Sequence, residues 1–180
     1  HGRCFKRGSH GSLRQRSNSD ALAEAIAVGA REAGHQVEKI SLTGRNIGFC
    51  QGCLACLKTG RCVLKDDAPA ITEKIHDADV LVFATPIYYY EMSGQMKTML
   101  DRANSLYGSD YRFTDVYFLS AAAEEEEGTD RRAVQGLEGW IDCFKRARLA
   151  GTVFAGGVTA PGDIQQHPAL EKARKLGASL

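Results

Sequence analysis

Short apolar runs alternate with amphipathic stretches along most of the chain. The most apolar run, residues 80–84, is β-branched and aromatic and too short for a helix, so it predicts a strand buried on both faces. Similar runs predict strands over 36–42, 115–122 and 151–158. Apolar residues at helical spacing predict helices over 20–33, 68–77, 94–106, 129–148 and 168–179. Strands that alternate with helices indicate an α/β fold with a parallel sheet covered on both faces.

The first ten residues, HGRCFKRGSH, fit this pattern poorly, because only Cys4 and Phe5 are apolar. We expect a weak first strand around 4–10. The string RGSH also fits the remnant of an expression tag, which is the alternative. Residues 1–180 are otherwise expected to form one domain, with residues 43–65 as an inserted loop that shows no clear periodicity.

Thr85-Pro86 follows the central strand and is expected to end it, because proline cannot donate to a sheet ladder. Three tyrosines, Tyr88, Tyr89 and Tyr90, come next. In an open α/β sheet, ligands bind in the crevice beyond the carboxyl ends of the strands. An aromatic loop at that place favours a flat aromatic cofactor.

Residues 11–19, GSLRQRSNS, form a hydroxyl-rich stretch before the first predicted helix. The free N–H groups at a helix start bind anions, and the helix dipole adds to the attraction. The stretch lacks the glycine pattern of a Walker or dinucleotide loop, and it suits a single terminal phosphate. The alternative is a solvated surface loop that only caps the helix.

Four of the six cysteines lie in one short stretch with the spacing Cys50-x2-Cys53-x2-Cys56-x5-Cys62. Iron–sulfur ferredoxins use a similar run of closely spaced cysteines, whereas structural zinc sites set two pairs a dozen or more residues apart. The spacing favours a [4Fe–4S] cluster. A zinc site and four free or disulfide-bonded thiols are the alternatives.

Composition excludes several partners. Lys and Arg number 23 against 22 Asp and Glu, so no strong field points to nucleic acid or a membrane surface. No apolar run reaches the roughly 20 residues of a transmembrane helix, and no signal-peptide pattern is present. The clustered cysteines are typical of a reducing compartment, so we expect a cytoplasmic protein.

Three motifs in order, GSLRQRSNSD, CQGCLACLKTGRCVLKDD and ATPIYYYEMSGQMKTMLDR, resemble the flavodoxin-fold NAD(P)H-dependent FMN reductase-like flavoproteins. The resemblance is strongest to their iron–sulfur flavoprotein branch, and AGGVTAPGDIQQHPALEKARKLG fits it as well. It implies a flavodoxin-like doubly wound sheet of five parallel strands, bound FMN, and a homodimer or homotetramer. Gly8-Ser9 offers a second start for the phosphate loop, but Gly11-Ser12 matches better.

The resemblance also assigns residues. The FMN phosphate is expected at Ser12, Arg14, Ser17, Asn18 and Ser19. The isoalloxazine ring is expected at Pro86, Ile87, Tyr88, Tyr89, Ser93 and Gly94, with Ala121 and Ala122 in the loop near 121–123 that completes the pocket. The [4Fe–4S] ligands are expected to be Cys50, Cys53, Cys56 and Cys62.

The leading hypothesis is an FMN oxidoreductase that takes electrons from NAD(P)H or a reduced partner. Quinones, nitro or azo compounds, free flavin or a ferredoxin-like protein are candidate partners, and no side chain is required as acid or base. One alternative is an electron-transfer module with little NAD(P)H turnover; another is a redox or metal sensor built on the cysteines. Arg102 is expected to form a helix-surface ion pair, and Trp140 and Cys143 to lie in the core.

Overall fold

The computed structural model describes residues 5–10 and 17–180, the former by their backbone alone. Strand β1 (Phe5–His10) is present despite its polar sequence, which confirms the expected first strand. It pairs in parallel with β2 (Gln36–Ser41) and with β3 (Val80–Tyr88). Because β1 continues through His10, the alternative phosphate-loop start at Gly8-Ser9 falls inside the strand.

Within the described residues the main path of the sheet runs β2-β1-β3-β5-β6, and all of its pairings are parallel. β5 spans Asp115–Ala121 and β6 spans Arg148–Ala155. This strand order is the doubly wound order of flavodoxin-like sheets. The two-residue strand β4 (Glu91–Met92) pairs antiparallel with the end of β3, so the expectation of a purely parallel sheet was wrong at this hairpin.

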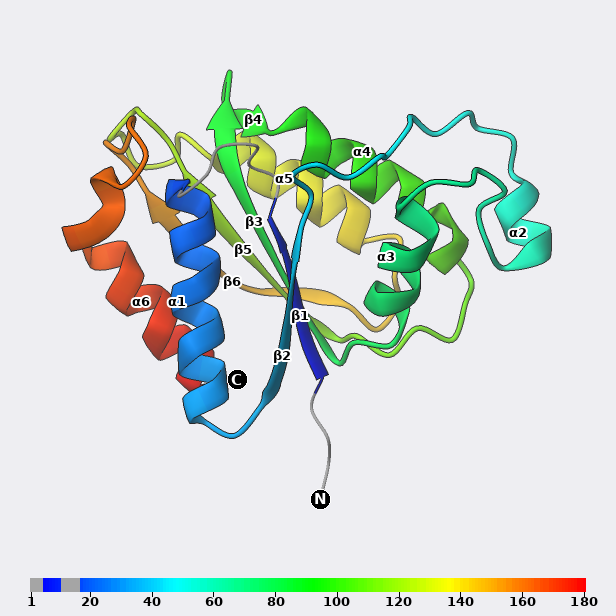
Figure 1. Ribbon diagram of the computed structural model, residues 1–180, viewed down its shortest axis with the longest axis horizontal. Coiled ribbons are helices and arrows are strands. Elements are labelled where there is room, and N and C mark those ends of the chain that lie inside the picture. Colours follow the sequence, from blue (N-terminus) through cyan, green and yellow to red (C-terminus); the bar gives the residue numbers. More distant parts are fainter. Residues whose placement is uncertain (1–4, 11–16) are drawn as a thin grey trace.

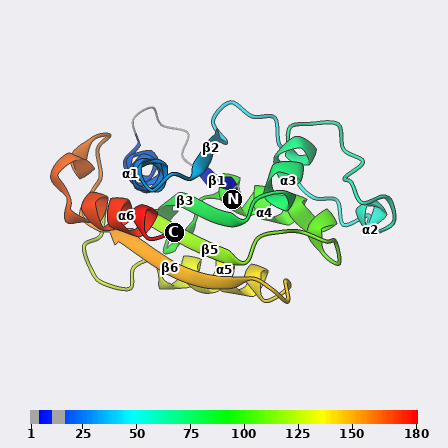
Figure 2. The ribbon, with the colours of Figure 1, turned by 90° about the horizontal axis from the view of Figure 1, so that it is seen from below.

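Helices cover both faces of the sheet, as predicted. α1 (Asn18–Glu32) and α6 (Pro168–Ala178) lie side by side on one face (Figure 1). α3 (Ala68–His76), α4 (Gly94–Arg102) and α5 (Arg131–Ile141) pack on the other. In the view of Figure 2, strands of the sheet lie between α5 on one side and α1 and α6 on the other. The fold therefore has three layers, with the carboxyl ends of the strands at one edge.

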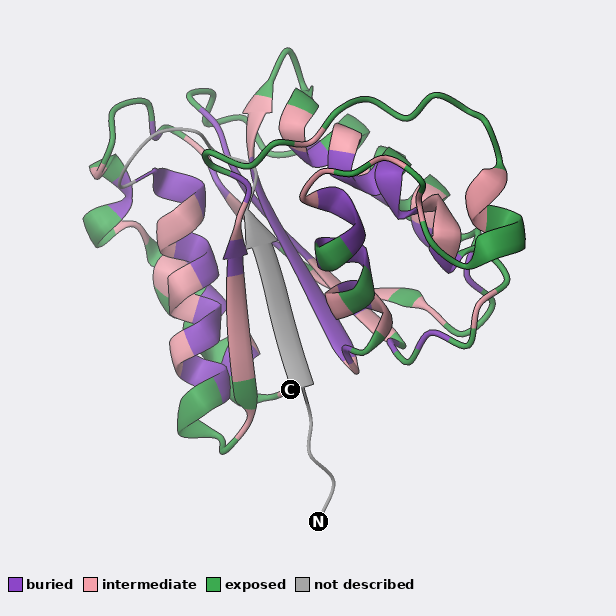
Figure 3. Cartoon of the chain, turned by 45° about the vertical axis from the view of Figure 1, so that its right-hand side comes forward, coloured by how far each residue is buried: buried purple, intermediate pink, exposed green. Residues whose placement is uncertain are grey.

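Strand β3 divides the core, because its successive side chains point to opposite faces. Leu81 and Phe83 pack under α3, α4 and α5, whereas Val82 and Ala84 pack under α1 and α6. All four side chains are buried, and β3 is the most continuously buried strand among the described residues (Figure 3). The apolar run at 80–84 thus predicted the central strand correctly.

Pro86 does not end this strand, contrary to the sequence prediction. β3 runs on to Tyr88, and Pro86 is paired in register with Ala121 of β5. On its other side, β1 pairs with β3 only as far as the His10–Ala84 partners. On the β1 side, no described residue pairs with Pro86. The missing N–H of Pro86 therefore leaves no described carbonyl without its donor, and proline is tolerated there.

Several predicted helices are shorter than expected. The stretch predicted as one helix over 94–106 becomes α4 followed by the 3-10 helix η1 (Ala103–Leu106), and α5 ends at Ile141 rather than near 148. Two short elements were missed: α2 (Ala55–Thr59) inside the cysteine loop, and the 3-10 helix η2 (Asp163–Gln166). Each is about one turn long, too short to leave a periodic pattern.

Two glycines allow α1 and α6 to approach closely. A Cβ added to Gly177 would lie 2.1 Å from the carbonyl oxygen of Ile26, and one added to Gly29 would lie 1.9 Å from that of Arg174. Both neighbours are backbone atoms, which cannot move without displacing a helix. The pair of glycines therefore sets the distance between the two helices.

Candidate functional site

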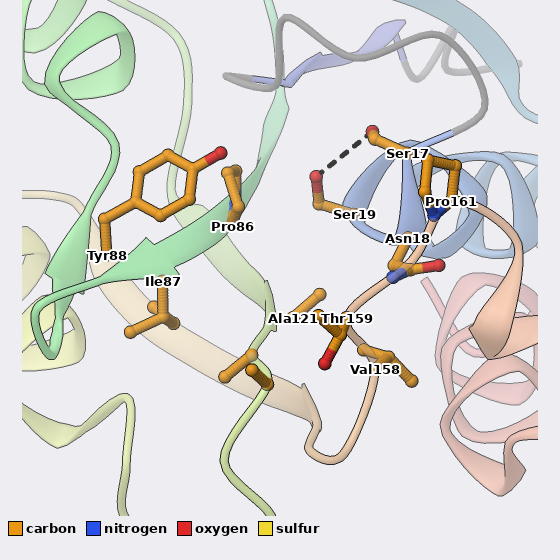
Figure 4. A pocket seen from close by; sticks show the side chains of 12 residues that line it. Ser17, Asn18, Ser19, Pro86, Ile87, Tyr88, Ala121, Val158, Thr159 and Pro161 are labelled. Atoms are coloured by element: carbon orange, nitrogen blue, oxygen red, sulfur yellow. Dashed lines mark hydrogen bonds between the residues drawn. The ribbon is translucent and has the colours of Figure 1, made fainter.

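A pocket opens at the carboxyl edge of the sheet, where β3, β5 and β6 end beside the start of α1 (Figure 4). The residues that line it come from four separate segments: Ser17, Asn18 and Ser19; Pro86, Ile87 and Tyr88; Ala121, Ala122 and Ala123; Val158, Thr159 and Pro161. In Figure 4, the serines lie on one side of the cavity and Ile87 and Tyr88 on the other. Polar and apolar walls thus face each other across one space.

The polar wall is the start of α1. The Ser17 side chain caps the helix by accepting a hydrogen bond from the Asp20 N–H at 3.1 Å. The Ser17 and Ser19 hydroxyl oxygens lie 3.4 Å apart, and both residues are buried. Two hydroxyls and the positive end of a 15-residue helix make this wall suitable for an anionic group such as a phosphate.

Asn18 links this helix start to the loop after β6. Its Nδ2 donates to the Ala160 carbonyl at 3.0 Å, and its Oδ1 accepts from the N–H groups of Gly162 and Ile164 at 3.2 and 3.4 Å. The side chain is nearly buried, at 8% exposure. Asn18 therefore holds the segment that contributes Val158, Thr159 and Pro161 to the pocket, a role that the sequence did not reveal.

Some predicted residues lie outside the pocket lining. Ser93 is buried, caps α4 by accepting from the Met96 N–H, and is hydrogen-bonded to Thr85. Gly94 begins α4 behind it, and the Tyr89 side chain is 98% exposed. Their contact with the ring stays a prediction. Ser12 and Arg14 lie outside the described residues.

The hairpin between β3 and β4 carries backbone strain. Tyr89 and Tyr90 have φ angles of 50° and 66°, in the left-handed region that non-glycine residues rarely adopt. The Arg132 guanidinium lies 5.9 Å from the centre of the Tyr90 ring. The buried hydrogen bond from the Ser93 N–H to the Thr85 hydroxyl, at 3.0 Å, ties the returning strand to β3. Tyr89 and Tyr90 are the two residues between the paired positions Tyr88 and Glu91, and positive φ at both is the geometry of a tight two-residue hairpin turn.

A second cavity lies in the loop between β2 and α3. All four clustered cysteines line it, together with Asp101, Arg102 and Asn104 from the end of α4 and the start of η1. Asn104 Nδ2 donates to the Cys56 sulfur, and Arg102 Nη2 donates to the Cys62 sulfur, each at 3.4 Å. The loop thus brings the four thiols around one space, as the spacing predicted.

Arg102 was predicted as a surface residue, and this was wrong. It is 2% exposed, and its guanidinium contacts Asp66 through Nη1–Oδ2 and Nη2–Oδ1 pairs of 2.5 and 2.8 Å. This contact, with backbone N–H groups of Gly48 and Ala68, lowers the pKa of Asp66. Lys97 is the residue that pairs with Asp101 at the surface. Helical position alone did not show that the cysteine loop covers this arginine.

The four cysteines of this cavity are arranged for a cluster rather than for a single metal ion. Within residues 17–180 no three His, Cys, Asp or Glu side chains are arranged to hold a single metal ion. A [4Fe–4S] cluster differs, because each thiolate binds a different iron and the sulfurs surround the cluster rather than one point. Four cysteines around one cavity, two with N–H donors on their sulfurs, fit that requirement.

Of the two remaining core predictions, that for Trp140 is confirmed and that for Cys143 is wrong. Trp140 packs against the main core cluster and contacts Phe83 edge-on, with ring centres 5.7 Å apart. Cys143 is exposed, so its predicted core position was wrong. It follows the last turn of α5, whose end the periodicity placed too late. Among the described residues, none of the helices combines the length and the apolar character that a membrane span requires.

Comparison with known proteins adds independent information. Residues 8–144 match the model of the family described as NADPH-dependent FMN reductase. An iron–sulfur flavoprotein of Archaeoglobus fulgidus is 34% identical over 96% of this chain and 77% of its own, and one of Methanocaldococcus jannaschii is 28% identical over 96% and 93%. The solved NAD(P)H:quinone oxidoreductase of Methanothermobacter marburgensis superposes with a TM-score of 0.74 at 21% identity, covering 97% of this chain and 94% of that one.

Proposed function

Since this chain belongs to the NADPH-dependent FMN reductase family and is similar along nearly its whole length to iron–sulfur flavoproteins, we propose that its pocket holds FMN. The protein is then a flavin-dependent oxidoreductase that takes electrons from NAD(P)H or a reduced partner. A quinone, a nitro or azo compound, free flavin or a ferredoxin-like protein accepts them. We place the protein in the cytoplasm, as a homodimer or homotetramer.

One observation supports this proposal most directly: the pocket joins a phosphate-type wall to a ring-type wall. The hydroxyls of Ser17 and Ser19 stand at the start of α1, while Pro86, Ile87 and Tyr88 stand across the cavity. FMN has one terminal phosphate and one flat ring system, so its two ends require these two surfaces. Ala121 and Ala122 line the space between the two walls, and their small side chains leave room for the cofactor.

The chain's own residues bind and orient, and we assign none of them acid–base chemistry. When bound, FMN supplies the redox chemistry, accepting a hydride and passing electrons on. Ser17 and Ser19 donate to the phosphate, and the dipole of α1 favours its charge. Pro86, Ile87 and Tyr88 exclude water from the ring. Asn18 keeps the 158–161 segment in place over the pocket.

We propose in addition that Cys50, Cys53, Cys56 and Cys62 hold a [4Fe–4S] cluster, which supplies a one-electron relay when bound. The shared cavity and the N–H donors on Cys56 and Cys62 support this assignment. Apolar side chains are exposed around the loop, with Phe49 at 81% and Leu54 at 56%. That surface favours a second candidate function, an electron carrier between proteins with little NAD(P)H turnover.

Binding and turnover test the proposal separately. Ser19→Ala removes a buried hydroxyl whose hydrogen-bond neighbour is the hydroxyl of Ser17, so the fold should persist while FMN binding weakens about tenfold, the effect of losing one donor to a charged group. Ser179→Ala, at the far end of α6, is the matched control. Flavin fluorescence titration measures the affinity, and unchanged binding by Ser19→Ala contradicts the phosphate assignment.

Steady-state NAD(P)H oxidation with a quinone separates the two functions. Sustained turnover by the FMN-loaded protein supports the oxidoreductase. No turnover, together with fast reduction by reduced ferredoxin, supports the electron carrier. Protein that takes up no FMN would rule out both.

A further inference from the structure

Two side chains donate hydrogen bonds to sulfur in the cysteine cavity. Arg102 Nη2 reaches Cys62 and Asn104 Nδ2 reaches Cys56, both at 3.4 Å. They belong to the junction of α4 and η1, not to the cysteine loop itself. The donors are therefore supplied by elements that are separate in sequence from the segment that carries the thiols.

Arg102 is held more firmly than a surface arginine. Its side chain is fully buried, and Nη1 donates to the Gly48 carbonyl at 2.8 Å. The Asp66 carboxylate accepts hydrogen bonds from both Nη1 and Nη2. Asp66 in turn accepts from the N–H groups of Gly48 and Ala68, at 3.0 and 3.1 Å. The guanidinium is thus fixed between the cysteine loop, the start of α3 and the end of α4.

This arrangement is not explained by stability alone. A buried ion pair recovers its desolvation cost only when its hydrogen bonds are complete. Arg102 Nε is buried and has no acceptor among the described residues. Buried donors without partners are rare in folded proteins, and each calls for an explanation. A sulfur-rich group in the adjoining cavity would offer acceptors that the chain does not provide.

We propose that Arg102 and Asn104 are positioning residues that raise the reduction potential of the cluster. The inference rests on the cluster assignment made above. One electron enters the cluster on reduction, and its net charge becomes more negative by one. Two N–H donors lie at the sulfur ligands, and one of them is the positive end of a buried ion pair. Such donors stabilise the more negative state more strongly than the oxidised one. Reduction thereby becomes easier.

The placement of these donors separates their effect from the flavin site. α4 begins at the Ser93 cap behind the β3–β4 hairpin and ends at Arg102, so its nine residues span about 13 Å. Neither Arg102 nor Asn104 lines the FMN pocket. Substitutions at these positions should change the cluster and leave FMN binding as it is.

The test uses the full-length protein with its cluster reconstituted anaerobically, in a redox titration followed by absorbance and electron paramagnetic resonance. Asn104→Leu removes one donor at similar volume. At a fixed applied potential it should lower the ratio of reduced to oxidised cluster about fivefold, as expected for one lost hydrogen bond. Arg102→Gln combined with Asp66→Asn removes the whole ion pair, so that neither charge is left buried without its partner. The net charge is unchanged, but the positive end of the ion pair no longer lies at the Cys62 sulfur. The ratio should therefore fall about tenfold, which is about 59 mV for a one-electron couple.

Arg174→Gln is the matched control, because this exposed arginine pairs with Glu32 on the opposite face of the sheet. Its cluster should titrate like that of the parent. Iron, sulfide and FMN are assayed first in each sample. Parent protein without iron and sulfide refutes the cluster itself. Full cluster content with an unchanged potential in both variants overturns the tuning role, and so does loss of the cluster from a folded Asn104→Leu protein, since the donor would then serve retention.

Discussion

Asn18 offers the sharpest test of how the pocket is built, because its side chain joins the start of α1 to the loop after β6. Asn18→Asp replaces the donor that faces the Ala160 carbonyl with a second acceptor, and it places a negative charge in the pocket. Asn18→Leu keeps the size but removes all three hydrogen bonds, including those from Gly162 and Ile164. The two variants therefore separate charge from support.

The magnitudes follow from the hydrogen bonds. In the FMN-free protein, Asn18→Leu should lower the free energy of unfolding by about 2–4 kcal/mol, because three bonds worth about 0.5–1.5 kcal/mol each are lost. Asn18→Asp should lower it by about 1 kcal/mol at most. It loses one bond, but a carboxylate at a helix start regains about 0.3–1 kcal/mol.

FMN affinity should show the opposite order. Asn18→Asp brings a like charge toward the phosphate, so binding should weaken about tenfold or more and recover partly at high salt. Asn18→Leu should weaken binding less, and the size of this loss relative to the parent should be the same at low and high salt. Urea unfolding and fluorescence titration at two salt concentrations measure these effects. Wild-type affinity in Asn18→Asp refutes the nearness of Asn18 to the phosphate, and wild-type unfolding of FMN-free Asn18→Leu refutes its role in holding the loop.

Three further predictions concern other parts of the molecule. Gly177→Ala should lower the free energy of unfolding by about 1–3 kcal/mol, because its Cβ meets the Ile26 carbonyl, whereas Gly139→Ala on α5 has open space and should be neutral or stabilising; equal effects in urea unfolding would contradict the packing argument. Cys53→Ser should abolish the broad absorbance near ~400 nm of anaerobically prepared protein, and its persistence would remove Cys53 from the ligands. Asp77 and then Asp110 raise the pKa of His76 through hydrogen bonds to its ring. The stabilisation is therefore complete below the ordinary pKa of about 6.5 and is lost as pH rises through the raised value. His76→Gln should flatten this part of the pH–stability curve, and an unchanged slope would show that His76 does not cause it.

Local sequence determined the elements with strong apolar patterns. The run at 80–84 identified the central strand, because a strand covered on both faces needs apolar side chains on both sides. The spacing of the four cysteines predicted that they would surround one space, since such short steps keep thiols together in any compact loop. The hydroxyl-rich segment before α1 predicted the polar wall of the pocket for the same reason: neighbours in sequence remain neighbours in space.

Tertiary structure decided what depends on distant partners. Pro86 stays inside β3 because β1 ends its described pairing at Ala84, and nothing near Pro86 in the sequence carries that information. Arg102 is buried because a loop some forty residues earlier folds over it and supplies Asp66. Asn18 reads as a phosphate ligand in its motif, yet its amide is occupied by a loop more than 140 residues away. A sequence fixes which groups a chain can offer, but the partners that satisfy buried polar groups are chosen only when the segments pack together.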